Sequence, residues 1–440
     1  MDELRSVKMY KREHRGEKDK LRIKFSVCIF IIYSLYFISG YTGAFHNYIN
    51  FGLFCLWNFF AYCEDRKSYT KAVLNKTSKY LFLFLLFYFF TSLISGGLVY
   101  TLEYIFLFMM LYGNVIQYKY YITRNNYSEI KILVRASFAS ILLFSVIAIT
   151  FYSIFPSAAR ILAADYYAFD TIAIGGGYAI AFGASLLSVF LTELIIRGNL
   201  NHTHTKYFMI CVIFLLEFLL VKTESTLTLL SSIIGILFAV IRRIYFGKKT
   251  AQSKMSIGKI MAIAGVIIIG LFLITNFQSI GLWILDLTSE NLDNVVLRRF
   301  NRIAEKIVYS GNGTMYTNYI DERWGTVVQS WNTFLSNPIF GVGYECGNTF
   351  SLLGKFGVGT HSELCDLLAQ HGVFGGISLF TFFILAFRGQ HNNCRCRAFI
   401  LTLLFMALFN PFRYYHGYFV CFFLIPMIDY LITHQKANFK

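Results

Sequence analysis

The sequence predicts an all-α polytopic membrane protein, and three observations carry the prediction. The chain is 56% hydrophobic and only 15% charged, whereas a soluble protein needs about 25% charged residues to cover its surface. Apolar runs such as 25–45 and 261–277 contain no charged residue, and they approach the length of about 20 residues that crosses a hydrocarbon core. Basic residues gather between these runs. Because every backbone polar group must be satisfied inside lipid, the runs are predicted to be helices.

About twelve apolar segments are expected to cross the membrane, within a single integral membrane domain spanning residues 1–440. In chain order they are 25–42, 48–64, 79–98, 101–118, 132–155, 171–196, 206–221, 226–241, 259–277, 372–387, 398–412 and 416–433. The basic N-terminus is followed by no small-residue cleavage site, so the first segment is expected to remain as an anchor.

Basic clusters set the predicted orientation. They occupy residues 5–24, 66–79, 119–135, 242–259 and 388–397, and Lys and Arg stay on the cytoplasmic side of a membrane. Alternating the twelve segments from a cytoplasmic N-terminus puts every cluster inside and the C-terminus inside as well. The net charge of +16 therefore reflects membrane topology and does not indicate nucleic-acid binding.

This orientation leaves a large outer loop between the ninth and tenth segments, residues 277–371. Two helices are predicted in it. The first starts near Trp324, carries an apolar stripe through Trp331 and Leu335, and ends before Pro338; we expect it to lie along the outer membrane surface. The second starts with the capping box Thr360-x-x-Glu363 and stops at Gly372.

The second predicted helix places His361 at a helix N-terminus, where free backbone donors can bind an anion. Glycines, including Gly341 and Gly343, separate the two helices and let a backbone approach a ligand closely. Cys346 and Cys365 also fall in this loop, where an oxidising compartment would permit a disulfide, although spacing alone does not establish one.

Three segments of this loop resemble the signature of the bacterial O-antigen polymerase and ligase family. They are Arg323-Trp324, the turn Asn337-Pro338-Ile339-Phe340-Gly341-Val342-Gly343, and His361-Ser362-Glu363-Leu364 running on to Gly372-Val373-Phe374-Gly375. The likeness covers about 55 residues, and Cys365 stands where the family carries its first Leu. The twelve-segment layout with a large loop between helices nine and ten agrees with the family as well.

The resemblance implies a glycosyltransferase, independent of metal and cofactor, that uses undecaprenyl-diphosphate-linked oligosaccharide at the periplasmic face of the inner membrane. His361 and Arg323 are the implied catalytic residues: the histidine would deprotonate or orient an acceptor hydroxyl, and the arginine would stabilise the diphosphate. Membrane lipids and a chain-length regulator are the other expected partners. The candidate residues for binding diphosphate or glycan are Arg160, Arg298, Arg299, Lys222 and Glu363, with Gly341 and Gly343 as loop backbone.

Several of these residues have a second interpretation. Arg298, Arg299 and Arg302 can equally contact lipid headgroups. Lys222 replaces an arginine that family members often carry at the start of the eighth helix, where this chain reads Thr223-Glu224-Ser225-Thr226. The absence of any D-x-D sequence argues against a nucleotide-sugar donor held by a divalent metal. His202 and His204 have no supporting ligand, so no metal site is expected there.

Two functions remain as alternatives to polymerase. An O-antigen ligase would use the same donor and transfer the glycan to lipid A-core. A lipid or polysaccharide transporter belongs to another class and would need charged residues within the membrane. Glu193, Glu217 and a break at Gly175-Gly176-Gly177 are the features that favour it, although pairing of Glu193 with Arg197 and pairing or snorkelling of Glu217 would explain both acids.

Overall fold

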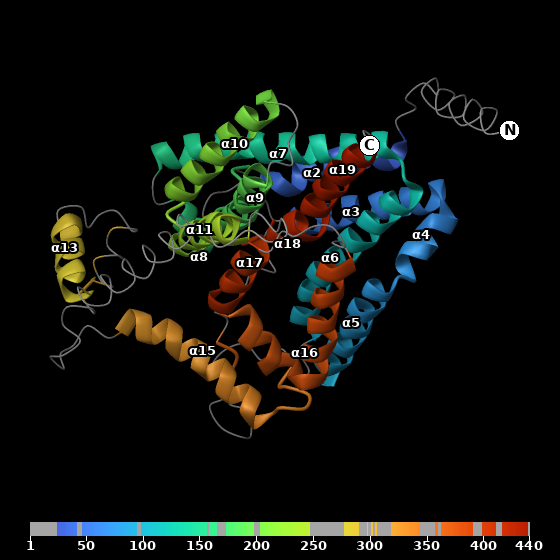
Figure 1. Cartoon of the computed structure of the whole chain (residues 1–440). Helices are drawn as coiled ribbons and strands as arrows, with labels where there is room; N and C mark the ends of the chain where they lie inside the picture. Colours follow the sequence, from blue (N-terminus) through green and yellow to red (C-terminus); the bar gives the residue numbers. More distant parts are fainter. Residues whose placement is uncertain are drawn as a thin grey trace, which may run out of the picture.

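The structure is a computed structural model of the chain (Figure 1). It describes residues 24–41, 46–94, 98–155, 158–164, 173–197, 203–246, 277–289, 297, 301, 304–305, 318–343, 357–359, 362–389, 398–410 and 416–438. Within these ranges the secondary structure is helical, and no sheet is formed. The all-α prediction is therefore confirmed for the described part of the chain.

The helices follow the predicted order. They are α2 (Phe25–Ser39), α3 (His46–Glu64), α4 (Arg66–Val73), α5 (Lys76–Ile94), α6 (Leu98–Arg124), α7 (Tyr127–Ile154), α8 (Ala158–Ala164), α9 (Tyr178–Ile196), α10 (Thr203–Lys222), α11 (Thr226–Phe246), α13 (Phe277–Ser289), α15 (Asn318–Ser336), α16 (Glu363–Gly389), α17 (Ala398–Phe409), α18 (Gly417–Phe419), the π-helical turn η1 (Val420–Leu424) and α19 (Ile425–Asn438).

Five of these helices are long and apolar enough to cross a membrane, namely α7, α9, α10, α11 and α16. A sixth crossing is possible if α4 and α5, which meet at a 63° bend, form one broken span. Helices α2, α17 and the segment Gly417–Ile432 are apolar but shorter. The predicted segment 259–277 lies almost entirely outside the described residues. The count of twelve remains a prediction.

Aromatic side chains fill the core around the last helical segment. Every residue from His416 to Asp429 is buried, so this segment contacts protein on all sides. The ring of Phe423 lies 5.1 Å from that of Phe30 on α2 and 5.3 Å from that of Trp57 on α3. Such tilted ring pairs add to the free energy gained by burying their large apolar surfaces.

Ion pairs join the ends of four helices on one side of this core. Arg124, at the end of α6, lies 3.0 Å from Glu129 near the start of α7 and 3.9 Å from Glu64 at the end of α3. Lys24, just before α2, lies 3.3 Å from the Glu129 carboxylate. All four ends belong to the side that the charge pattern assigned to the cytoplasm.

A second ionic cluster joins three more helix ends of the same predicted side. Glu193 near the end of α9 is 2% exposed. It pairs with Arg197 one turn later, and it accepts a hydrogen bond from Arg242 of α11 at 3.0 Å. Its other oxygen accepts the backbone amide of Ala398, the first residue of α17, at 3.2 Å. The predicted pairing of Glu193 with Arg197 is confirmed.

The opposite helix ends meet through backbone contacts. Gly175, Gly176 and Gly177 all have positive φ and directly precede α9. The backbone is therefore non-helical at the glycines where the break was predicted, and α9 starts after them, at Tyr178; residues 171–172 of that segment lie outside the described residues. A Cβ on Gly40, at the end of α2, would lie 2.1 Å from the Gly176 nitrogen. This contact requires glycine and brings the end of α2 to the start of α9.

Candidate functional site

Helix α15 confirms the first helix predicted in the outer loop, although it starts earlier, at Asn318. Its predicted stripe faces outward, because Trp331 is 45% and Leu335 is 58% exposed. Its polar residues Ser330 and Thr333 are fully buried instead. Since water favours the reverse arrangement, this helix has its apolar face toward a nonaqueous environment or another apolar surface.

The turn after α15 packs against the middle of α16. A Cβ on Gly341 would lie 2.4 Å from the carbonyl of Gln370, and a Cβ on Gly372 would lie 2.4 Å from the Ile339 oxygen. Both glycines have positive φ, 72° and 60°, which side chains disfavour. Gly343 donates its amide to the Gln370 oxygen at 2.9 Å. The two backbones therefore cross where only glycine fits.

Helix α16 starts two to three residues later than predicted. Ser362 accepts the backbone amide of Cys365 at 3.2 Å, so Ser362 caps a helix that begins at Glu363. The capping box proposed for Thr360 is therefore wrong in register, and Thr360 itself lies outside the described residues. Gly372 interrupts α16 with φ 60° and ψ −165°, which confirms the predicted stop, although a second helical stretch follows directly.

A buried carboxylate joins α15 to the start of α16. Asp366, which is fully buried, accepts the Ser330 hydroxyl at 2.5 Å and the backbone amide of Ser362 at 3.0 Å. The Ser330 oxygen in turn accepts the backbone amide of Gly359 at 2.8 Å. Because buried polar groups are costly to leave without hydrogen bonds, these contacts hold the two helices and the 357–359 segment together.

Close packing reinforces the same junction. A Cβ on Gly359 would lie 2.0 Å from the carbonyl oxygen of Thr326 on α15. Thr333, about one helical turn after Ser330, donates its hydroxyl to the Gly357 oxygen at 2.9 Å. We call α15, 337–343, 357–359 and 362–372 the motif unit, because these segments carry the sequence signature and pack together.

Glu363 connects the motif unit to the central helical segment. It is 1% exposed and accepts the Tyr418 hydroxyl at 3.2 Å. His371 lies deeper, 1% exposed, with its ring 4.7 Å from that of Tyr88 and 5.4 Å from that of Phe84, both on α5. Figure 1 shows α16 running from α15 alongside α5. Two buried polar residues thus connect the motif unit to its neighbours: Glu363 contacts α18 and His371 contacts α5.

Sequence reasoning missed Asp366, Ser330, Tyr418 and His371. The only available signal was for Asp366, which follows Ser362 by one helical turn and therefore reaches back to the helix start. Nothing in the sequence pairs Ser330 with Asp366 or Tyr418 with Glu363, because these contacts join separate segments.

Both predicted catalytic side chains and most of the predicted substrate-binding ones lie outside the described part of the chain. His361, Arg298, Arg299 and Arg302 lie outside the described residues, as do the side chains of Arg323 on α15 and Arg160 on α8. Cys346 lies outside them too, and Cys365 is a free thiol.

Lys222, at the end of α10, is described. Its ammonium lies 5.5 Å from the centre of the Phe218 ring. No hydrogen bond or ion pair within the described ranges joins Lys222 to the motif unit. It begins the turn to α11, in which Glu224 has a positive φ of 53°. Among the described residues, Lys222 therefore has no polar contact with Glu363 or with the backbone of Gly341 and Gly343.

The second acid predicted within a membrane segment is held by two neighbouring helices. Glu217 of α10 accepts the hydroxyls of Ser188 on α9 and Ser232 on α11. Hydrogen bonding to serines thus accounts for this residue, where ion pairing or snorkelling was expected. Among the described residues, no group of three His, Cys, Asp or Glu side chains is arranged to hold a metal ion.

Comparison with known proteins adds no identification: no family model matches this chain, and no curated protein matches its sequence.

Proposed function

We propose that the protein is an O-antigen polymerase, a glycosyltransferase that joins undecaprenyl-diphosphate-linked repeat units at the periplasmic face of a bacterial inner membrane. In this proposal the chain crosses the membrane twelve times, both termini are cytoplasmic, and residues 277–371 form the periplasmic loop. The reaction needs no metal or cofactor.

The observation that carries the proposal is the contact between Gly341 and Gly372. The two glycines stand in different parts of the family signature, yet each occupies the space where the other segment's backbone passes. A random match to a glycine-rich pattern would give no reason for those two positions to need glycine. The geometry supplies one reason for both, which supports the resemblance.

The environment of α15 supports the proposed location. Its exposed apolar face carries Val328, Trp331 and Leu335, and Trp is favoured at a membrane–water boundary. Just beyond it, the exposed ring of Phe340 stacks on that of Phe374 at 5.9 Å. An apolar surface of this kind suits the substrate, which is itself embedded in lipid through its undecaprenyl chain.

The chemistry assigns one role to each candidate catalytic residue. An acceptor sugar hydroxyl attacks the anomeric carbon of the donor glycan, and His361 takes the hydroxyl proton. The bond from that carbon to the diphosphate oxygen breaks, and its electron pair leaves with undecaprenyl diphosphate. Arg323 stabilises the charge that grows on the leaving group. Attack opposite the leaving group inverts the anomeric configuration.

Arg323 and His361 come from the two helical segments that Asp366 joins. Arg323 belongs to α15, and His361 directly precedes Ser362, the capping residue of α16. Arg160, Arg298, Arg299 and Lys222 are further proposed contacts for diphosphate or glycan. Glu363, which is buried in this structure, is proposed to orient the start of α16.

The test replaces each candidate catalytic residue in the producing bacterium. His361→Ala and Arg323→Ala should abolish long glycan chains and leave lipid A-core bearing a single repeat. His204→Ala and Arg135→Ala are matched controls, because both residues are exposed and lie on the predicted cytoplasmic side; they should leave chain length unchanged.

Other phenotypes would identify the alternatives. Bare cores with polymer retained on undecaprenyl diphosphate would indicate a ligase. Repeat units retained on the cytoplasmic side would indicate a transporter. Unchanged chain length in both Ala variants at normal protein levels would contradict a transferase centred on His361 and Arg323.

A further inference from the structure

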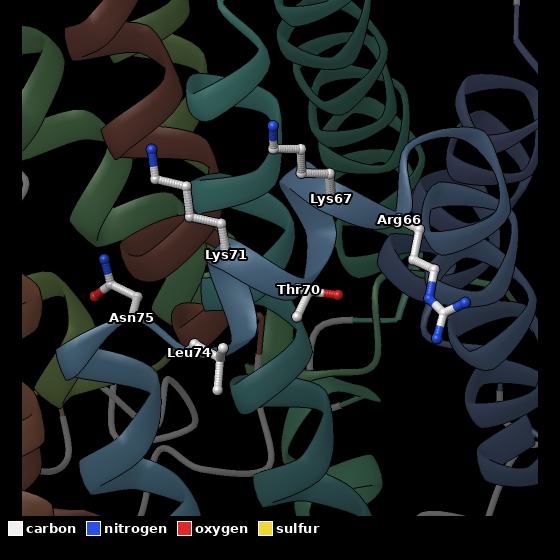
Figure 2. A pocket seen from close by; sticks show the side chains of 6 residues that line it. All are labelled: Arg66, Lys67, Thr70, Lys71, Leu74 and Asn75. Carbon is white, nitrogen blue, oxygen red and sulfur yellow. The ribbon is translucent and has the colours of Figure 1, made fainter.

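A cationic cavity lies far from the motif unit, where α4 turns into α5. Its volume is about 770 Å³, and the residues that line it are Arg66, Lys67, Thr70, Lys71, Leu74 and Asn75. Figure 2 shows Lys67 and Lys71 pointing the same way from one side of α4, and the amide nitrogen of Asn75 pointing with them, while Arg66 points elsewhere. Residues four apart on a helix share a face, which explains this alignment.

Two helix caps order the backbone at this bend. Asp65 caps α4 by accepting the amide of Ser68 at 3.0 Å. Asn75 caps the next helix, since its side-chain oxygen accepts the amide of Thr77 at 3.0 Å. With the oxygen engaged, Asn75 presents its NH₂ group to the cavity as a donor. The cavity therefore offers two ammonium groups and an amide donor.

The nearby acids do not neutralise these lysines. Glu64, Asp65 and Glu129 each pair with Arg124 instead. Within the described residues neither Lys67 nor Lys71 forms an ion pair, and both are exposed. Among the described residues, no acid pairs with the lysines at this bend, which favours an anionic ligand.

The surroundings favour a ligand that also has an apolar part. Leu74 lines the cavity and is 60% exposed. Beyond the bend, the outward face of α5 carries Phe82, Leu83 and Leu86, exposed by 49%, 52% and 39%. Phe82 follows Lys76 by six residues, which is about 9 Å along a helix. The cations and the amide donor lie at the bend, and the apolar face of α5 follows them. A phospholipid has the same order, with a charged headgroup followed by acyl chains.

We propose that the α4–α5 bend binds the phosphate of an acidic phospholipid, with Lys67, Lys71 and Asn75 contacting the headgroup and α5 contacting the acyl chains. The bend lies on the side that the charge pattern predicts to be cytoplasmic, where juxtamembrane cations attract anionic headgroups. This site is independent of the proposed glycan chemistry. It would fix the depth and tilt of α5, against which α16 packs.

The test uses the delipidated full-length protein in detergent and native mass spectrometry to measure binding of phosphatidylglycerol and phosphatidylcholine. The wild type should bind phosphatidylglycerol more tightly. Lys67→Gln/Lys71→Gln should weaken that binding by about twenty-five-fold, because each cation contributes about a fivefold factor, and should leave phosphatidylcholine binding unchanged. Lys67→Arg/Lys71→Arg should restore binding, since it keeps the charge.

The matched control is Lys76→Gln/Lys79→Gln, which removes the same charge from exposed positions of α5 that do not line the cavity. It should weaken phosphatidylglycerol binding less than twofold. Equal loss in both double variants would overturn the site and leave only a general charge effect. Inorganic phosphate binding as tightly as phosphatidylglycerol would overturn the lipid assignment. Melting temperatures of all variants confirm that each is folded.

Discussion

The two ends of the molecule are held together in different ways. We call the helix ends around Arg124 and Glu193 the arginine end, because buried carboxylates there pair with arginines from neighbouring helices. The motif unit at the other end is closed by glycine contacts at Gly341, Gly359 and Gly372 and by hydrogen bonds to Asp366. At the arginine end charge stabilises the fold. In the described part of the motif unit, close backbone packing and the hydrogen bonds of Asp366 do so.

This difference separates structural arginines from candidate functional ones. Arg124 pairs with Glu129, and Arg197 and Arg242 share the carboxylate of Glu193, so all three arginines are engaged in holding helices together. In the motif unit the described contacts are glycine packing and the hydrogen bonds of Asp366, and Arg323 is proposed to bind the diphosphate. Four predictions test the comparison.

The largest effect is expected at the arginine end. Glu193→Ala removes the carboxylate that pairs with two arginines and accepts the Ala398 amide. Breaking a buried ionic cluster by removing one partner costs about 3–5 kcal/mol. The melting temperature of the detergent-solubilised protein should fall strongly. Glu305→Ala, a half-buried acid without an ion pair among the described residues, is the control and should change it little.

A single added methyl group at Gly341 should disrupt the packing of the turn after α15 against α16. Gly341→Ala adds a Cβ 2.4 Å from the Gln370 carbonyl at a φ of 72°, and the left-handed conformation alone costs about 1–2 kcal/mol. We expect the unit to open, with loss of long glycan chains and faster proteolysis between α15 and α16.

Gly325→Ala is the matched control for that substitution. Gly325 lies on α15 with no atom within 4 Å of an added Cβ, so alanine there should stabilise the helix by up to about 1 kcal/mol. If Gly341→Ala and Gly325→Ala behave alike, the backbone crossing does not hold the unit together.

The sequence was sufficient to predict the helices but not how they meet. Apolar periodicity placed α15 and α16, because a helix face repeats along one segment. It mistook the start of α16, since Thr360 and Ser362 are equally good capping residues and the choice depends on Asp366 contacting Ser330. The contacts of Glu217 and Tyr418 were also unpredictable, because each joins helices distant in sequence.

A smaller effect is expected from the hydrogen bonds within the motif unit. Asp366→Asn replaces a side chain that accepts the Ser330 hydroxyl and the Ser362 amide with one that must turn an NH₂ toward one of these donors, and leaving a buried donor unsatisfied costs about 1–3 kcal/mol. Stability should fall by about 2 kcal/mol in a denaturant titration. Ser330→Ala should cost a similar amount, and the double variant should cost less than the sum.

Ser336→Ala is the control for Ser330→Ala, since Ser336 is exposed on the same helix and bonds only to its own turn at Asn332. Additive costs in the Asp366 and Ser330 double variant would contradict a direct connection between α15 and α16 through these two residues.

The smallest effect on stability, and the sharpest test of location, concerns the outer face of α15. Trp331 is 45% exposed, so Trp331→Phe should change the unfolding free energy by no more than about 0.5 kcal/mol. In vesicles containing brominated lipid, however, Trp331 should be strongly quenched if α15 lies at the membrane surface, so the variant should lose a large share of the quenchable fluorescence. Trp57 is fully buried and should contribute little. If quenching is unchanged in Trp331→Phe, the apolar face of α15 faces protein instead of lipid, and the motif unit does not lie on the membrane.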